Sequence, residues 1–495
     1  MLRIRMNKKW MFVILPLIFS ILIMGALINS SQAYRLRLAN YYIKRGNDQK
    51  AIELYSKVLR KQEIYKQYVG LKQDEDIPLR YTLAQLFVRG GDFLQAARLI
   101  RQIVRRDPLF SRDILFNVQE HRGTIKFGMA LFKQGLPHLA LNQFRRANMV
   151  NPDHPLGFYY AALLLDKMGD KEKSLVQMSK VVDLYYKKIK PDNGNKYSYF
   201  ADAFYRLANN YEKSGDLEKA RDYYKEVLHL GNYRSAEACY HLFTLLNHDN
   251  QGQVRTSFEQ KFRNMSPQYK VPYALKDGAR FLGYSLNVKE FELFNEGLVA
   301  FFWEIGEKSP VFNYKKQNLA NIYKLGSRLV IVKEIKNLAP NFGFEADSPS
   351  ADFPLGWNSD YYHAPYEIHE IQFDMLPLGR SQCLVLNNSQ RERTNCQTEL
   401  IPVNDQNYYM QAGWIKSMDG RAFLGRRWLD ENKNDNGYDY VVLDVKDPKW
   451  KHYAQVIKPQ PGSLYCRLWA TNFMSHGEAF FDDIVFFKLE ILNYI

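Results

Sequence analysis

The residues best suited to bind a ligand stand on an expected strand at residues 464–471. Because successive side chains of a strand point to opposite faces, this strand has one apolar face and one mixed face. The apolar face, assigned to the core, carries Leu464, Cys466, Leu468 and Ala470. The other face carries Tyr465, Arg467, Trp469 and Thr471. Flat aromatic rings pack against the apolar side of a sugar ring, and polar side chains bind its hydroxyls.

A second expected strand extends this candidate binding face. Arg426 and Trp428 stand two residues apart on it, so both point to one side. In the alternative interpretation, Trp414, Trp428 and Trp469 fill the core, and Arg467 is a charge on a solvated sheet face. The residues alone leave both interpretations open.

No residues with catalytic spacing accompany these side chains. The chain has no phosphate-binding glycine loop, no G-x-S-x-G elbow and no H-E-x-x-H. Asp482 and Asp483 are neighbours on an expected strand, so they point to opposite faces and cannot act as a glycosidase pair. We therefore expect a protein that is not an enzyme. The alternative is a glycan-processing hydrolase with an unrecognised site.

The cysteines indicate neither zinc nor a full set of disulfides. Cys383 and Cys396 are close enough in sequence to form a disulfide in an exported protein, which leaves an odd cysteine in the same region. Cys466 falls on the face assigned to the core, so we expect a buried thiol. No cysteine spacing is typical of a zinc site.

Residues 340–495 have the pattern of an antiparallel β-sandwich or jelly roll. Short runs with β periodicity alternate with turn residues about every ten positions, which is typical of such folds. The expected strands are Cys383–Leu386, Tyr408–Ile415, Ala422–Trp428, Ala454–Ile457, Leu464–Thr471 and Ala479–Lys488.

The order of motifs in this region resembles the xylan- and glucan-binding jelly-roll carbohydrate-binding modules. The motifs are the segment 341–345 (NFGFE), Gly356-Trp357, Tyr409-x-Gln-x-Gly-Trp414, Trp450 and the closing segment 477–484 (GEAFFDDI). The resemblance implies a glycan ligand. It also implies a structural calcium ion held by Glu345 and Asp482, with Asp347 or Asp483 as further ligands, because calcium prefers carboxylate and carbonyl oxygens. The alternative is a solvated acidic pair at a strand end.

A ladder of glycines organises residues 34–255. Five glycines each have a small residue seven positions earlier and another five positions later, which predicts helix hairpins whose backbones approach closely. The glycines are Gly46, Gly91, Gly135, Gly169 and Gly215. The pattern resembles the tetratricopeptide repeat, although the glycines are 34 to 46 residues apart against a repeat of about 34. We expect an α-solenoid with lengthened second helices or loops and a cap at Arg234–Asn247. The resemblance implies a protein partner.

Residues 256–339 predict a linker and a small β-rich region. Its expected strands are Ala279–Leu286, Leu298–Ile305 and Arg328–Ile335, the last with clear alternation. The alternative is a set of further helices packed under the solenoid.

Residues 1–33 predict a membrane anchor. Trp10–Ile28 is an uncharged run after a basic tail, long enough to span a bilayer. We expect a single-pass protein of the plasma membrane with a cytoplasmic N-terminus and an exported remainder. Cleavage after Ala33 is the alternative.

The composition favours a globular protein of several domains. The chain has 495 residues, of which 46% are hydrophobic and 15% aromatic, which excludes a disordered protein. The formal charge is +15, but the basic residues are scattered and no nucleic-acid motif accompanies them. An anionic membrane surface or an acidic polysaccharide suits such a charge equally well.

Together these features predict a multidomain α + β protein that acts as a membrane-anchored, exported scaffold. Its solenoid would bind a protein partner and its jelly roll a polysaccharide, in cell-envelope or exopolysaccharide assembly. The alternative is a scaffold that binds only proteins and whose sandwich binds no sugar.

Overall fold

The computed structural model describes most of the solenoid and much of the β-rich half. It covers residues 31–69, 76–108, 118, 120–188, 198–231, 234–246, 252–274, 279–286, 293–294, 296–305, 321–325, 327–339, 357–359, 366–370, 382–388, 394–418, 421–473 and 477–489. The chain forms two compact units, residues 1–118 and residues 119–495.

The predicted localisation as a single-pass membrane protein is contradicted. Among the residues that the structure describes, no helix has the length and apolarity needed to cross a membrane. The run Trp10–Ile28, on which the prediction rested, lies outside the described residues. The predicted anchor is therefore not supported.

Helix hairpins make up the described part of the first unit. A helix covers residues 31–44, and further helices follow it. They are α2 (Asp48–Val69), α3 (Ile77–Arg89) and α4 (Phe93–Arg106).

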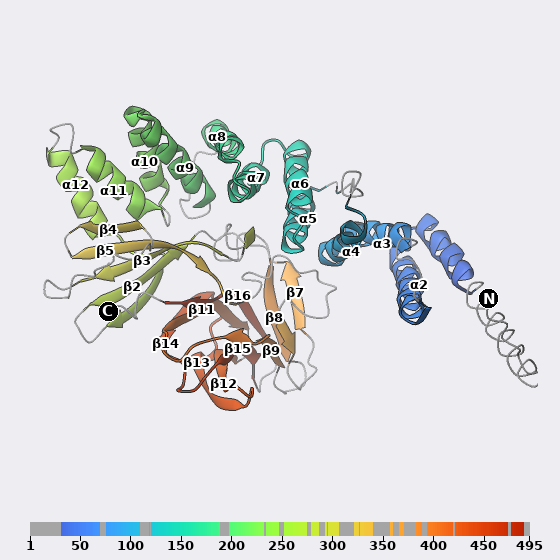
Figure 1. Cartoon of the computed structure of the whole chain (residues 1–495). Coiled ribbons are helices and arrows are strands. Elements are labelled where there is room, and N and C mark those ends of the chain that lie inside the picture. The colour runs from blue at the N-terminus through green and yellow to red at the C-terminus, as the bar shows by residue number, and fades with distance from the viewer. Residues whose placement is uncertain are drawn as a thin grey trace, which may run out of the picture. The chain divides into compact units, whose positions relative to one another are not determined.

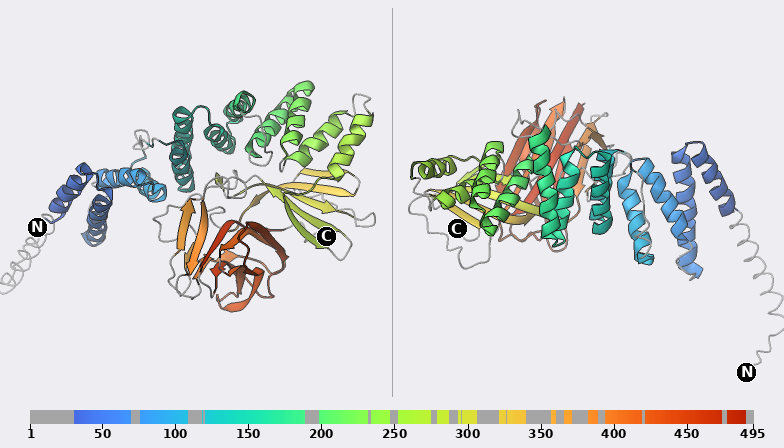
Figure 2. Two further views of the ribbon diagram at one scale, coloured as in Figure 1. Left: turned by 180° about the vertical axis from the view of Figure 1, so that it is seen from behind. Right: turned by 90° about the horizontal axis from the view of Figure 1, so that it is seen from above.

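The second unit begins with four more hairpins, whose helices lie side by side in the view from above in Figure 2. They are α5 (His121–Lys133), α6 (Pro137–Val150), α7 (Pro155–Lys167), α8 (Lys171–Lys188), α9 (Ser198–Ser214), α10 (Leu217–Leu230), α11 (Ser235–Leu245) and α12 (Gly252–Arg263).

The five ladder glycines end the first helices of their hairpins. All five have a positive φ, between 72° and 87°. A Cβ at any of them would meet no atom within 4 Å, so the backbone conformation is what requires glycine. The residue after each glycine donates its backbone N–H to a carbonyl at the end of the helix, as Asp170 does to Leu165 at 2.9 Å. This bond is typical of a Schellman C-cap.

Small residues fill the helix crossings, as the pattern predicts. Ala162 and Ala208 are fully buried, and Ser174 donates its hydroxyl to the carbonyl of Ala162 at 2.8 Å. A Cβ at Gly128 would lie 2.7 Å from the ring of Phe144, so this position has no room for a side chain.

Two features of the solenoid differ from the simple repeat. The second helices α2 and α8 have 22 and 18 residues, which confirms that some second helices are lengthened. The expected cap at Arg234–Asn247 is instead the first helix of a complete hairpin, because α12 packs against α11 through Cys239, Phe258 and Phe262. The helical region therefore extends to Arg263.

A five-stranded antiparallel sheet, sheet A, follows the solenoid and lies within the region expected to be rich in strands. Its strand order is β1-β2-β3-β5-β4. The strands are β1 (Tyr269–Ala274), β2 (Arg280–Leu286), β3 (Glu296–Glu304), β4 (Asn321–Leu325) and β5 (Arg328–Lys336). One face packs under α11 and α12, with Phe302, Val330 and Val332 against Phe262 (Figure 1).

Sheets B and C form the antiparallel sandwich that the sequence predicts. Sheet B has the order β13-β12-β15-β9-β6, with β10 beside β15, and sheet C has the order β14-β11-β16-β8-β7. Sheet B contains β6 (Trp357–Ser359), β9 (Thr394–Thr398), β10 (Ile401–Pro402), β12 (Ala422–Leu429), β13 (Asp435–Val445) and β15 (Tyr465–Asn472). Sheet C contains β7 (Tyr366–Glu370), β8 (Gln382–Asn388), β11 (Tyr409–Met418), β14 (Lys451–Ile457) and β16 (Gly477–Lys488).

Sheet C lies between the other two sheets. Its residues Met410, Val485 and Phe487 pack against sheet A, in a cluster with Phe301 and Trp303. Residues of its opposite face, such as Ile415, Phe481 and Phe486, pack against Leu424, Trp428 and Leu468 of sheet B. The second unit is therefore layered as helices, sheet A, sheet C and sheet B.

Gly90 and Gly91 provide a matched pair of substitutions. Gly91 has a φ of 79°, so Gly91→Ala should destabilise the α3–α4 hairpin by about 1–2 kcal/mol. Gly90 has a φ of −79° and room for a Cβ, so Gly90→Ala should be neutral or stabilise by up to about 1 kcal/mol. Hydrogen–deuterium exchange of α3 and α4 measures both effects. Equal exchange in the two variants would contradict the assigned role of φ.

Candidate functional site

The outer face of sheet B is the candidate functional site. Its inner face belongs to the core shared with sheet C. In the described part of the chain, no helix and no further sheet packs against its outer face, at the end of the layered unit (Figure 1). No described element therefore covers the side chains of this face.

Strand pairing places the side chains of this face in two rows. In the first row, Gly425 of β12 lies opposite Tyr440 of β13 and opposite Trp469 of β15, and Trp469 lies opposite Gln397 of β9. Residues directly opposite in antiparallel strands share a face. The first row is therefore aromatic, with an amide at its end.

The second row carries charge. Arg427 of β12 lies opposite Tyr438 of β13 and opposite Arg467 of β15. Two guanidinium groups therefore stand beside each other on neighbouring strands. Together the two rows form the sheet B platform, which consists of Gln397, Arg427, Tyr438, Tyr440, Arg467 and Trp469.

The rings of the platform contact one another. The ring centroids of Tyr438 and Trp469 are 6.3 Å apart with an interplanar angle of 30°, and those of Tyr440 and Trp469 are 6.4 Å apart at 68°. The guanidinium carbon of Arg427 lies 5.0 Å from the centroid of the Trp469 ring, a cation–π distance. Trp469 is consequently only 4% exposed and forms the floor of the platform, whereas Tyr438 is 60% exposed.

Gly425 allows the residues of the first row to pack closely. A Cβ at this position would lie 2.9 Å from the Tyr440 ring and 2.8 Å from the carbonyl oxygen of Asp439. The absence of a side chain thus lets the Tyr440 ring lie directly over the β12 backbone, beside Trp469.

The two predicted residues of the neighbouring strand point the other way. Arg426 is 1% exposed, and its guanidinium donates to the side-chain oxygens of Gln411 at 3.0 Å and Gln455 at 2.7 Å. Burial lowers the pKa of Arg426 to about 10. Trp428 is fully buried and donates its ring N–H to Asp439 at 2.7 Å. Both are core residues, so the predicted extension of the site through them is wrong.

The alternation predicted for β15 is correct except at its start. Cys466, Leu468 and Ala470 are buried in the core, as predicted, and Arg467 is half-buried on the outer face with Trp469. Leu464 precedes the strand and is 46% exposed, so it is not a core residue. Tyr465 begins the strand and is half-buried.

The other tryptophans singled out by the sequence are structural. Trp357 belongs to the core between sheets B and C, and Trp414 packs against the cluster between sheets A and C.

The predicted disulfide is not present. Cys383 and Cys396 are both buried free thiols, and they belong to different hydrophobic clusters. Cys383 packs with Val385 and Phe480, whereas Cys396 packs in the core between sheets B and C. Cys466 is also a buried free thiol, as predicted, and burial raises the pKa of its thiol above the ordinary range.

The predicted calcium ligands are only partly within the described residues. Asp482 and Asp483 are buried on β16, at a bulge opposite Ala412 and Trp414 of β11. Asp483 has a φ of 51°, and its backbone N–H donates to the Asp482 carboxylate at 2.8 Å. Glu345 and Asp347 lie outside the described residues. Within the described ranges no group of three or more His, Cys, Asp or Glu side chains could hold a metal ion.

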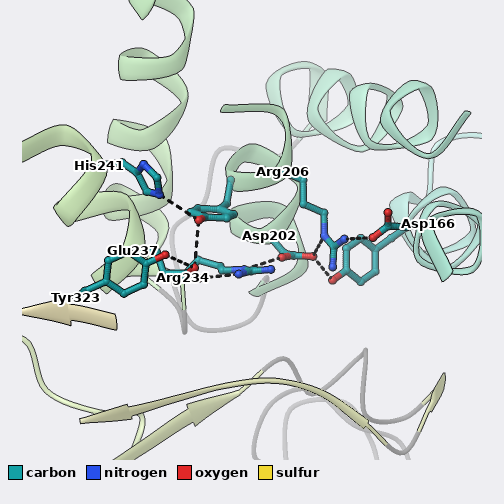
Figure 3. Close-up of polar contacts among 9 residues, drawn as sticks. Asp166, Asp202, Arg206, Arg234, Glu237, His241 and Tyr323 are labelled. Carbon is teal, nitrogen blue, oxygen red and sulfur yellow. Dashed lines mark hydrogen bonds and ion pairs between the residues drawn. The ribbon is translucent and has the colours of Figure 1, made fainter. Parts of the chain in front are cut away.

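A buried polar network joins the solenoid helices, and the sequence reasoning missed it (Figure 3). Asp202 of α9 is fully buried. It accepts hydrogen bonds from the Tyr159 hydroxyl of α7 at 2.8 Å, from Arg206 at 2.8 Å and from Arg234 at 3.3 Å. One carboxylate therefore ties α7 and α9 to the start of α11.

The same network reaches sheet A. Glu237 of α11 is fully buried and accepts from Arg234 at 2.6 Å, from the Tyr205 hydroxyl at 3.1 Å and from the Tyr323 hydroxyl of β4 at 2.9 Å. Burial, reinforced by the charge of Glu237, raises the pKa of Tyr205 and of Tyr323 above their usual range, so both hydroxyls remain donors. The only sequence signals of this network are the i,i+4 pair Asp202/Arg206 and the i,i+3 pair Arg234/Glu237.

Comparisons with known proteins identify the repeats. The tetratricopeptide repeat family matches residues 32–62 and residues 201–230, which fall on the first described hairpin and on α9–α10. The chain therefore contains tetratricopeptide repeats, as the glycine ladder predicts. No curated protein matches the chain.

Solved structures are similar to separate parts of the chain. The crystal structure of MamA is 20% identical over 39% of this chain and 93% of that chain, with a TM-score of 0.21. The CBM22-1 xylan-binding domain from Paenibacillus barcinonensis Xyn10C is 13% identical over 30% of this chain and 92% of that chain, with a TM-score of 0.23. The enzymatically active domain of bacteriophage CBA120 tailspike protein 4 is 15% identical over 31% of this chain, with a TM-score of 0.26, and this chain spans 21% of it. Because these sequence identities and TM-scores are low, the similarities do not indicate a function for this chain.

The buried network predicts a graded response to substitution. Asp202→Ala leaves two arginines short of their buried counter-charge and should cost about 3–5 kcal/mol. Tyr323→Phe removes one hydrogen bond to Glu237 and should cost about 1–3 kcal/mol, felt mainly at β4 and α11. Hydrogen–deuterium exchange of the full chain, resolved by peptide, measures both. Asp222→Ala, which breaks an exposed pair with Lys225, is the matched control and should cost under about 1 kcal/mol. Asp202→Ala and Asp222→Ala would show equal exchange if the network contributed nothing.

Proposed function

We propose that this protein is a non-catalytic scaffold whose repeats bind a protein partner and whose sheet B platform binds a glycan. The observation that carries the proposal is the pair of rows on the outer face of sheet B, with Tyr440 and Trp469 beside Arg427 and Arg467. Aromatic rings on an open sheet face suit the apolar side of a sugar ring, and the flanking polar groups suit its hydroxyls.

The side chains of the platform support this assignment individually. Tyr438 offers an exposed ring, stacked against Trp469. Gln397 is 4% exposed, and its carbonyl oxygen has no hydrogen-bond donor among the described residues. A buried acceptor without a donor costs free energy. A sugar hydroxyl reaching Gln397 from the platform would supply the donor.

The repeats support a protein partner only in general terms. Tetratricopeptide repeats form extended surfaces that bind proteins. In the second unit, sheet A contacts helices α7 and α11, each the first helix of its hairpin. The contacts are the Lys167–Glu334 ion pair at 3.1 Å and the Tyr323–Glu237 hydrogen bond. The partner is therefore proposed to bind the parts of the helices that sheet A leaves free.

Glycan binding by the full chain tests the proposal. Tyr438→Ala should weaken binding by about tenfold, or about 1.4 kcal/mol, because it removes the exposed ring of the platform. At 60% exposure, Tyr438 can be replaced without disturbing the core. Isothermal titration calorimetry against a panel of neutral and acidic polysaccharides provides the measurement.

Tyr186→Ala is the matched control, since Tyr186 is 58% exposed on α8 and lies away from sheet B. It should bind glycan as the wild type does. If the wild type bound no polysaccharide of the panel, the glycan part of the proposal would fail, and a scaffold that binds only proteins would remain.

We further propose that Asp482 and Asp483 contribute to a structural calcium site completed by Glu345 or Asp347. Support comes from the two carboxylates buried at one bulge, since calcium requires six to eight oxygen ligands. A chelator should lower the melting temperature of the wild type and leave that of Asp482→Asn unchanged, as differential scanning fluorimetry would show. Asp447→Asn, at an exposed pair with Lys451, should respond to the chelator like the wild type. An unchanged wild-type melting temperature would argue against the site.

A further inference from the structure

The two arginines of the platform stand in an arrangement that is unfavourable without a ligand. Arg427 and Arg467 lie directly opposite each other on β12 and β15, on the same outward face. Like charges directly opposite each other in a sheet destabilise it. An anion bound between them would offset this repulsion.

Among the residues that the structure describes, the counter-charges of these two arginines are incomplete. The Arg427 guanidinium has Asp435 at 3.5 Å on the edge strand β13, an exposed and therefore weak ion pair. Arg467 forms no ion pair with any described residue, and its Nε–H is buried without a hydrogen-bond acceptor among them. A guanidinium presents five donors in a planar fork that matches a carboxylate with two parallel hydrogen bonds.

The neighbouring groups decide which kind of anion fits. Trp469 and Tyr440 lie in the next row of the same face, within one strand repeat of the two arginines. An aromatic row beside a cationic row matches a polymer that presents a flat apolar ring and a carboxylate on the same residue. A uronic acid unit has both features, and the formal charge of +15 would attract such a polymer over distance.

We infer that the sheet B platform selects an acidic polysaccharide, with a uronate carboxylate between Arg427 and Arg467 and the sugar ring against the exposed ring of Tyr438, which the buried Trp469 supports. This inference rests on the proposed glycan function and adds the class of sugar. Neutral polysaccharides use only the aromatic rings of the platform and bind more weakly.

The test compares acidic polymers with their neutral forms on the full chain. The probes are polygalacturonate, alginate and hyaluronan, each paired with its methyl-esterified or carboxyl-reduced form. The acidic form of at least one pair should bind about tenfold more tightly, because hydrogen bonds between a guanidinium and a carboxylate are stronger than those to a neutral group. Added salt should weaken the acidic form and leave the neutral form unchanged.

Substitutions distinguish the contribution of the two arginines to binding from that of the other platform residues. Arg467→Gln and Arg427→Gln should bring the acidic-to-neutral affinity ratio towards one while the neutral form binds as before. Arg421→Gln is the matched control. Arg421 directly precedes β12 of the same sheet and forms an ion pair with Asp444. It should keep the wild-type ratio.

The outcomes distinguish the inference from the function on which it rests. Equal binding of acidic and neutral forms would overturn the acidic selectivity and leave glycan binding intact. Binding of neither form would overturn both. Displacement of the acidic sugar by single-stranded DNA or an acidic peptide of equal charge, at equal concentration, would show attraction to polyanions alone and would also overturn the inference.

Discussion

The layered half of this protein depends on the position of sheet C. It packs on sheet A through Met410, Val485 and Phe487, and on sheet B through residues such as Phe481 and Phe486. Sheet C thereby supplies cores on both sides, and the helices α11 and α12 cover the far face of sheet A. Sheet B is left with one buried face and one outward face. The aromatic and cationic side chains gather on that outward face, and this is why we assign the function of the jelly roll to it.

The sequence predicts those features of the fold that depend on strict periodicity. The five ladder glycines all adopt the positive φ that their pattern implies, since no other residue ends these helices without strain. The strands β8, β11, β14 and β16 of sheet C and the core face of β15 lie where the sequence predicts strands, whereas β7 was not among the expected strands. β13 was missed because it carries Asp435, Asp439 and Asp444, which are depleted in strands. Its Tyr438 and Tyr440 were therefore absent from the predicted site.

Only part of the candidate site was predicted from the sequence. The reason is that an assignment of β12 that is wrong by one residue exchanges its inward and outward faces. The sequence has arginine at both 426 and 427, so charge alone cannot show which of the two points outward. The core settles the question, because Leu424 and Trp428 must be buried and Arg426 shares their face. The buried network of Asp202 and Glu237 was beyond prediction for another reason. Its hydrogen bonds join helices to one another and to β4 between residues that are far apart in the sequence. A local sequence pattern does not predict such contacts.

The central claim is that a ligand of the jelly roll lies on the outward face of sheet B. The most direct measurement is hydrogen–deuterium exchange of the full chain, with and without a polysaccharide that it binds, resolved to individual strands. The account predicts slower exchange at β12, β13 and β15, where the platform residues stand, and unchanged exchange in the strands of sheet A. Protection confined to the solenoid, or to sheet C without sheet B, would contradict it.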